Sequence, residues 1–415
     1  MTGPLRYMAR WVSEVAHVWK RELRLMFTDI GIILFFFVLP LAYPLVYTLI
    51  YNPEVVNDIA VAVVDNSRTS QSRDLVRQLD ATPAIDVVGY ASSLSEAKRW
   101  HAEKRCYGVL VIPESYARNL GRGEQSTVEF YSDMSLLIRF RSFLSALTDV
   151  QLATGAKIRS ELMASAGVSG SMGGGAPISN QAFFLGDTEQ GFASFVIPGI
   201  LVLILQQSLI LGVTMLAGTS TERSLRNGGT DPLEVPAGIT ATAVGKTLAY
   251  LVTYIPMAVY ALHYVPMIFS LPHIGSMTQY LPFILPMFIA SSFLGMIIAR
   301  LMVREREMAF MVVVFTSVVF LFLSGLTWPR YAMSPFWYWV GNCIPAVWGV
   351  EGFIRINSNG ADLSAVSHPY LMMWLQCVVY FVIYWTLMKW TRRRQVVAAV
   401  SQKDISATEL PSETV

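Results

Sequence analysis

Long apolar runs dominate the hydrophobic pattern of this chain. A run of about 18 or more apolar residues can cross the roughly 30 Å hydrocarbon core of a bilayer as a helix. Six such runs are present: Ile30–Tyr51, Phe192–Ala217, Leu248–Phe269, Tyr280–Ala299, Ala309–Leu326 and Pro369–Met388. The pattern predicts an α-helical integral membrane protein with six transmembrane helices, the first over 30–51 and the other five within 192–391. The first run lacks a small-residue cleavage site, so we expect an uncleaved anchor.

Residues 1–29 show a different periodicity. Charged side chains recur every three or four positions, at Arg10, Glu14, His17, Arg21 and Arg24. Trp11 and Trp19 lie with other apolar residues on the opposite face of the predicted helix. Such a helix lies in the plane of the membrane interface, so the pattern predicts an N-terminal amphipathic elbow helix.

Between the first two runs, residues 52–191 have the composition of a soluble domain. Short β-branched runs predict three strands, at Ile59–Val64, Gly108–Ile112 and Val128–Tyr131. Helical patterns separate them, at Ser70–Leu79, Ser95–Lys104 and Glu114–Leu120. A longer helix is expected over Ser135–Ala164, followed by a glycine-rich linker at Gly167–Gly175. Strands that alternate with helices predict a small α/β domain.

The distribution of Lys and Arg predicts the orientation, because short basic flanks prefer the cytoplasm. Basic residues gather before the first run, between the second and third, between the fourth and fifth, and after the sixth. The connection over 270–279 has none. Both termini, including the tail 392–415, are therefore expected to be cytoplasmic, and the α/β domain extracytoplasmic.

Composition agrees with a membrane protein: 53% of the residues are hydrophobic and only 14% are charged. These values argue against a cytosolic enzyme. The net charge of +2 provides no strong field for nucleic acid. The three cysteines, Cys106, Cys343 and Cys377, are too scattered for a disulfide framework or a zinc site, so no metal site is expected.

No motif for ATP hydrolysis is found. Gly245-Lys246-Thr247 resembles the end of a phosphate-binding loop, but Thr240 stands where that motif requires glycine. The six runs contain no Asp, Glu, Lys or Arg, and His263 is their one residue that titrates near neutral pH. We expect His263 to be a satisfied interfacial residue. An ion-driven carrier needs intramembrane charges, so any transport must take its energy from a partner.

Two further features could serve a transport function. Gln206 and Gln207 lie inside the second run, where they either pack between helices or line a substrate path. The segment 327–356 is crowded with aromatic residues and prolines, including Trp328, Pro329 and Pro345. It is too broken to span a bilayer, and we expect a re-entrant pair of short helices, or alternatively an interfacial aromatic belt.

In this order of parts, the chain resembles the type-2 permeases of ATP-binding-cassette exporters, in the branch with a large ectodomain. Ectodomain motifs similar to that family are Val61–Ser67, Tyr107–Pro113 and Tyr131-Ser132-Asp133. The loop 218–247 resembles the family's coupling segment, with Glu222, Arg223, Arg226, Thr230, Glu234 and Pro236. The later segment resembles its re-entrant signature, with Trp328, Pro329, Pro345, Glu351 and Arg355. Glu351 and Arg355 stand at i, i+4, a spacing that predicts an ion pair on a helix.

The resemblance implies a permease subunit of an ATP-driven exporter that works across the bacterial inner membrane. Such a subunit works with a second permease half, identical or paralogous, and with separate cytoplasmic ATPase subunits that hold ATP and Mg²⁺. No cofactor is expected in this chain, and a periplasmic adaptor is an open possibility. An alternative is a membrane-anchored sensor or scaffold whose extracytoplasmic domain binds a ligand or partner. The sequence favours the exporter, because no cytoplasmic output domain is recognised.

Overall fold

The computed structural model of the protein describes residues 4–51, 56–122, 124–132, 137–165, 192–303 and 305–408. Contacts divide the chain into two compact units. Met1–Asn52 and Phe184–Val415 form one, here called the helical unit, and Pro53–Phe183 forms the other, here called the α/β unit.

The helical unit contains six helices that are long and apolar enough to cross a membrane, among the residues that the structure describes. The first combines α2 (Ile30–Ile33), a π-helical turn η1 (Leu34–Val38) and α3 (Leu39–Tyr51). The third combines α9 (Ile239–Val259), η2 (Tyr260–Tyr264) and α10 (Val265–Ile268). The other four are α8 (Phe192–Arg226), α11 (Met277–Met302), α12 (Arg306–Leu323) and α15 (Ser367–Thr408). The prediction of six membrane-spanning helices is confirmed.

Helix α1 (Pro4–Met26) precedes the first of these helices and packs along α9. Its buried stripe includes Val15, Val18 and Met26, and it meets α9 at Gly245. A β-carbon at Gly245 would lie 2.8 Å from Val18 and 2.9 Å from a backbone oxygen of α1, so only glycine permits this approach. Asp29 then ends the turn after α1 by accepting the backbone N–H of Gly31 at 2.8 Å, as the N-cap of α2.

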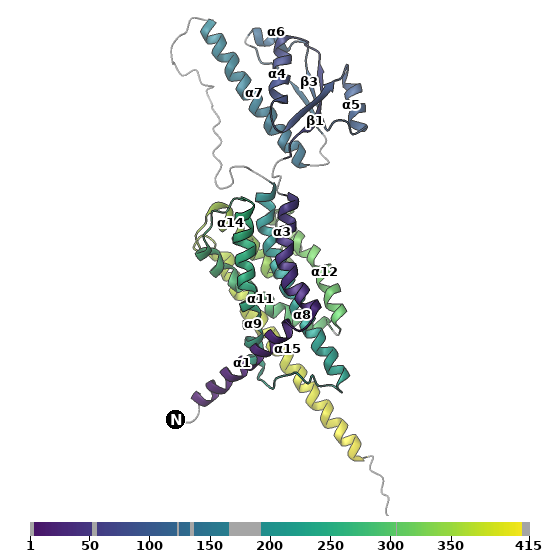
Figure 1. Ribbon diagram of the computed structural model, residues 1–415, viewed down its shortest axis with the longest axis vertical. Helices are drawn as coiled ribbons and strands as arrows, with labels where there is room; N and C mark the ends of the chain where they lie inside the picture. The colour runs from purple at the N-terminus through teal and green to yellow at the C-terminus, as the bar shows by residue number, and fades with distance from the viewer. Residues whose placement is uncertain are drawn as a thin grey trace, which may run out of the picture. The chain divides into compact units, whose positions relative to one another are not determined.

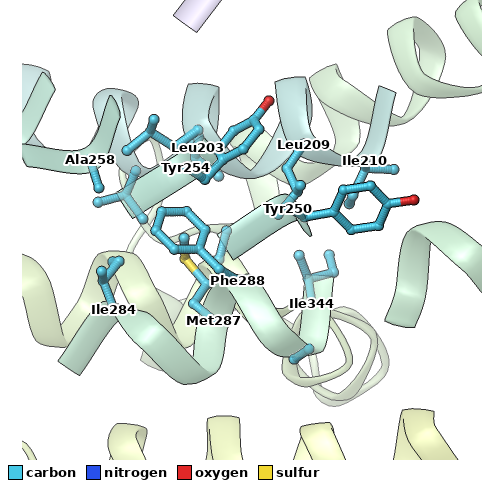
Figure 2. Packing of buried hydrophobic residues seen from close by; sticks show 14 of the residues in the cluster. Leu203, Leu209, Ile210, Tyr250, Tyr254, Ala258, Ile284, Met287, Phe288 and Ile344 are labelled. Atoms are coloured by element: carbon cyan, nitrogen blue, oxygen red, sulfur yellow. The ribbon is translucent and has the colours of Figure 1, made fainter. Parts of the chain in front are cut away.

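The core of the helical unit lies where α8, α9 and α11 meet (Figure 2). The rings of Tyr254 and Phe288 pack edge to face, with centroids 5.9 Å apart, among aliphatic side chains that include Leu203 and Ile284. Close packing of this kind holds membrane helices together, because lipid supplies little hydrophobic driving force between them.

Between α12 and α15 the chain forms a short 3₁₀ turn, η3 (Arg330–Ala332), and two helices, α13 (Pro335–Asn342) and α14 (Pro345–Asn359). Most of α14 is buried against α8 and α11. Gly352 makes this possible, because a β-carbon there would meet the ring of Phe283 on α11. In contrast, α13 exposes several aromatic side chains. Helix α14 is therefore part of the bundle core.

The α/β unit is built on a four-stranded sheet of order β2-β1-β3-β4 (Figure 1). Strands β1 (Ile59–Asp65), β2 (Ile85–Tyr90) and β3 (Gly108–Ile112) are parallel, and β4 (Glu129–Ser132) is antiparallel to β3. The sequence analysis predicted three of these strands and missed β2. That strand is half exposed and interrupted by Gly89, so it lacks a clear β-branched run.

Helices cover both faces of this sheet. On one face, α4 (Ser70–Asp80), α6 (Tyr116–Gly121) and α7 (Leu137–Ser165) contribute to a core with Val61 and Val63. On the other face, α5 (Leu94–Ala102) packs over Ala62 and Val64. Figure 1 shows α5 on the opposite side of the sheet from α4 and α7. The alternation of β1 side chains between two cores shows that this strand is buried on both sides. The predicted linker Gly167–Gly175 lies outside the described residues.

Candidate functional site

The connection between α8 and α9 is the first candidate site, and it is anchored by a buried carboxylate. Helices occupy both ends of the predicted loop 218–247, which leaves residues 227–238 as the connection. Within it, Asp231 accepts hydrogen bonds from Ser220 at 2.6 Å and from Arg223 at 3.0 and 3.1 Å. Arg21 of α1 reaches the same carboxylate at 3.1 Å. One side chain thus joins the connection to both α8 and α1.

The environment of Asp231 favours its ionised form. Burial by itself raises the pKa of this carboxyl group, but hydrogen bonds from Arg223, Ser220 and the Leu233 N–H outweigh it and lower the pKa to about 2. Asp231 is therefore an anion at neutral pH, and its charge is balanced by the two arginines.

A second buried carboxylate lies beside the first. Glu22 of α1 is 1% exposed and accepts a hydrogen bond from the Tyr250 hydroxyl at 2.7 Å. Lys246 lies 3.5 Å from Glu22. Both partners belong to α9. Glu22 and Asp231, with Arg21, Arg223, Lys246, Ser220 and Tyr250, are here called the buried ion network. It joins α1, α8, α9 and the 227–238 connection.

Glu222, next to Arg223 on α8, points to a different partner. Its carboxylate accepts the backbone N–H of Arg306 at 2.7 Å, at the start of α12. The Arg306 guanidinium in turn binds Asp29, the N-cap of α2, at 2.9 Å. Two adjacent α8 residues therefore fix two different connections.

The other predicted coupling residues do face solvent. Arg226, Thr230, Glu234 and Pro236 are exposed. Leu225 and Leu233 beside them are 68% and 49% exposed, which is high for leucine. These six residues are here called the loop surface. It combines two apolar side chains with charges of both signs, and Asp231 ties the connection to α1 and α8.

The two glutamines of α8 differ in their surroundings. Gln206 is buried and accepts hydrogen bonds from Ser291 at 3.2 Å and from the Ala346 N–H of α14. Gln207 instead lines a groove of about 650 Å³ between α3, α8 and α12, here called the α3–α8–α12 groove. Neither polar atom of its amide has a hydrogen-bond partner among the described residues. Gln206 is therefore a packing residue, and Gln207 is the candidate for lining a path.

Around α14, the predicted pair of Glu351 and Arg355 is present at 2.9 Å. Glu351 also binds Arg330, which the sequence analysis did not single out. The Arg330 guanidinium lies 4.4 Å from the ring centroid of Trp348, and it also bonds Asn342. Pro345 begins α14 in the first turn, where proline is tolerated, whereas Trp328 and Pro329 are exposed. The sequence feature that could have identified Arg330 is its position among many aromatic residues.

The α/β unit has a cavity of its own, of about 410 Å³, bordered by α4, α6 and α7. Its lining mixes apolar side chains with uncharged polar ones, including Gln125, Ser126 and Thr154. The Ser126 hydroxyl has no partner among the described residues. A cavity of this size is large enough for a small molecule.

Two comparisons with known proteins bear on identity. No curated protein matches the chain. The family described as ABC-2 family transporter protein matches residues 30–386, a range that begins at the first membrane-spanning helix and ends within the sixth. Because this match covers most of the sequence, the chain belongs to the ABC-2 transporter family: it is a multi-pass membrane component of transport, whose ATPase is a separate subunit.

Proposed function

We propose that this protein is the membrane-spanning permease subunit of an ATP-driven exporter, paired with a second permease half and driven by a separate ATPase. The observation that most supports this proposal is the way the 227–238 connection is bonded to the helices around it. Its exposed side offers apolar and charged groups to a partner, and its inner side is held by the buried ion network. Because hydrogen bonds and ion pairs tie this segment to neighbouring helices, a partner that moves the segment also moves those helices.

The attachments suit a coupling role. Asp231 connects the loop surface to α1 through Arg21 and to α8 through Arg223. Glu222 connects the same end of α8 to the start of α12. Because buried ion pairs with good geometry resist separation, force applied at the loop surface reaches α1, α8 and α12 together.

The orientation follows from the basic flanks. The loop surface, both termini and the connection between α11 and α12 lie on the cytoplasmic side, where a soluble ATPase has access. The α/β unit then lies outside the bacterial inner membrane, where it meets cargo or a periplasmic adaptor.

The α3–α8–α12 groove is the proposed contribution to the substrate path, which a second permease half would close. Its lining is mainly aromatic and aliphatic, with the unpaired amide of Gln207 as a polar group. An apolar groove with few polar groups suits a neutral, amphipathic cargo.

A double change in the loop surface tests the coupling assignment. Arg226→Glu with Leu233→Asp alters exposed side chains only, so we expect a folded, inserted protein that no longer copurifies with its ATPase. The matched control is Glu307→Lys, another exposed charge at the start of α12, which should retain the ATPase. Normal copurification by the double variant would contradict the assignment.

Copurification of the wild-type protein distinguishes a permease from the alternative, a membrane-anchored sensor or scaffold. A permease copurifies with a chain that contains a nucleotide-binding ATPase motif, identified by mass spectrometry after mild solubilisation. A sensor that only signals through its spans would lack that partner.

A further inference from the structure

Two histidine side chains face each other at the end of α9 remote from the buried ion network. His263 lies in η2, and His273 lies in the connection between α10 and α11. The Nδ1 atom of His263 is 2.9 Å from the Nε2 atom of His273, and the two rings are inclined by 70°. The local sequence pattern did not predict this pairing.

The hydrogen bonds of Asn357, on α14, define the protonation of this pair. The Asn357 amide nitrogen donates to the Pro272 carbonyl at 3.2 Å, so its Oδ1 faces Nδ1 of His273. That oxygen can only accept, so His273 carries its proton on Nδ1. Nε2 of His273 therefore carries no proton, and it accepts a hydrogen bond from the Nδ1–H of His263.

The backbone around the pair is fixed. The Ile274 N–H donates to the Asn357 carbonyl at 2.9 Å. A β-carbon at Gly275 would lie 2.7 Å from the Ile356 carbonyl oxygen, so the connection lies directly on α14. The fully buried ring of Tyr280 packs beside both imidazoles, with centroids 5.9 Å from His273 and 6.3 Å from His263. The two nitrogens are therefore preorganised.

We propose that His263 Nδ1 and His273 Nε2 form a binding site for a divalent first-row transition-metal ion, of the class of Cu²⁺ or Ni²⁺. The ion binds the lone pairs of both nitrogens from beside the line that joins them. His263 loses the proton from Nδ1 and takes one from solvent on Nε2, so both rings remain neutral ligands. Imidazole is a common ligand for these metals. Asn357 fits the role of the outer partner, because a metal-bound histidine usually donates its other N–H to an oxygen.

The nitrogen separation selects this class of ion. With metal–nitrogen bonds of about 2.0–2.1 Å, a separation of 2.9 Å gives an angle of about 90° at the metal. This is the angle between neighbouring ligands in square-planar or octahedral sites, which Cu²⁺ and Ni²⁺ adopt, and it is too small for tetrahedral Zn²⁺. No group of three or more metal-binding side chains occurs in the described part of the chain, so water completes the coordination.

The site would hold together elements that are distant in sequence. His263 belongs to the third membrane-spanning helix, and His273 is tied to α14 through Asn357. A bound ion would therefore fasten the end of that helix to α14. The proposal does not depend on the ATPase or on the substrate path.

The test is electron paramagnetic resonance of Cu²⁺ added to the full-length protein in nanodiscs, purified without a histidine tag. For the wild-type protein we expect one Cu²⁺ per chain, with hyperfine structure from two imidazole nitrogens. This measurement requires no variant. His263→Gln and His273→Gln should each lower Cu²⁺ affinity at least about tenfold. His17→Gln removes an exposed histidine of α1 and should leave the affinity unchanged.

Two results would overturn the proposal. One is a wild-type spectrum with fewer than two nitrogen ligands. The other is equal Cu²⁺ affinity in the wild type and the His263→Gln/His273→Gln double variant, which would show that the pair makes an N–H···N hydrogen bond alone. A rise in melting temperature on adding Ni²⁺, present in the wild type and absent in the double variant, would support the site by an independent readout.

Discussion

Asp231 is the residue at which the loop between α8 and α9 is held in place. Its carboxylate meets Arg21 and Arg223 with little access to water. Asp231→Asn keeps the size of the side chain but leaves two arginines without their counter-ion. We expect a loss of about 3 kcal/mol in the free energy of unfolding of the helical unit. Thermal or denaturant unfolding in detergent measures it.

The control for this change is Glu307→Gln, because Glu307 is exposed and its removal should cost less than about 1 kcal/mol. The lowered pKa of Asp231 also predicts a pH effect on stability. The pKa of Asp231 is lowered from 3.8 to about 2, so its stabilisation is complete above about pH 4 and is lost as the pH falls toward 2. Equal stability of Asp231→Asn and Glu307→Gln would contradict the assigned role.

Arg330 and Arg355 share the carboxylate of Glu351 but differ in burial. The Arg330 side chain is 12% exposed and stacks on Trp348, whereas the Arg355 side chain is 49% exposed. Arg330→Ala should therefore destabilise the protein by about 3 kcal/mol and Arg355→Ala by less than about 1 kcal/mol. Unfolding of the two variants side by side gives the comparison.

A charge exchange provides a second check on Glu351. Glu351→Arg with Arg355→Glu restores an i, i+4 pair but places the new arginine beside Arg330. We expect this exchange to fail to recover stability. Full recovery would show that Arg355 is the main partner after all.

Among the helices, the contact of α1 with α9 depends on Gly245. Gly245→Ala should weaken this contact by about 1–3 kcal/mol, because the added methyl group meets a backbone oxygen and Val18, and the backbone cannot move aside easily. The measurement is the unfolding free energy together with the accessibility of Lys246 to an amine-reactive reagent, which should rise.

Gly155→Ala on α7 is the matched control, since nothing lies within 4 Å of the added methyl group. In that helix alanine should be neutral or slightly stabilising, because glycine is the poorer helix former. If Gly245→Ala behaves like Gly155→Ala, the close approach of α1 to α9 is not needed for stability.

At the scale of the whole molecule, the topology can be tested by labelling. In a background with Cys106, Cys343 and Cys377 replaced by alanine, we place single cysteines at Glu124 and Asn227, both exposed. A membrane-impermeant maleimide added to intact inner-membrane preparations of known orientation should label Glu124→Cys from outside and Asn227→Cys from the cytoplasmic side. The opposite pattern would reverse the orientation and remove the loop surface from reach of an ATPase.

The sequence by itself determined which segments can cross a membrane and which strands are buried. Both follow from local pattern: transfer of apolar residues into lipid favours runs such as 30–51, and burial on both faces favours β-branched runs such as Gly108–Ile112. Both ranges were predicted with the bounds that the structure gives. Strand β2 was missed because its half-exposed pattern carries too weak a local signal.

The tertiary structure alone decided the partners of the polar residues. Gln206 and Gln207 are adjacent and chemically identical, yet one bonds α14 and the other lines a groove. Glu222 and Arg223 are adjacent in sequence, yet one bonds the start of α12 and the other bonds Asp231. His263 meets His273 because α14 holds the connection that carries His273. Such choices depend on how helices approach one another, and no local periodicity contains that geometry.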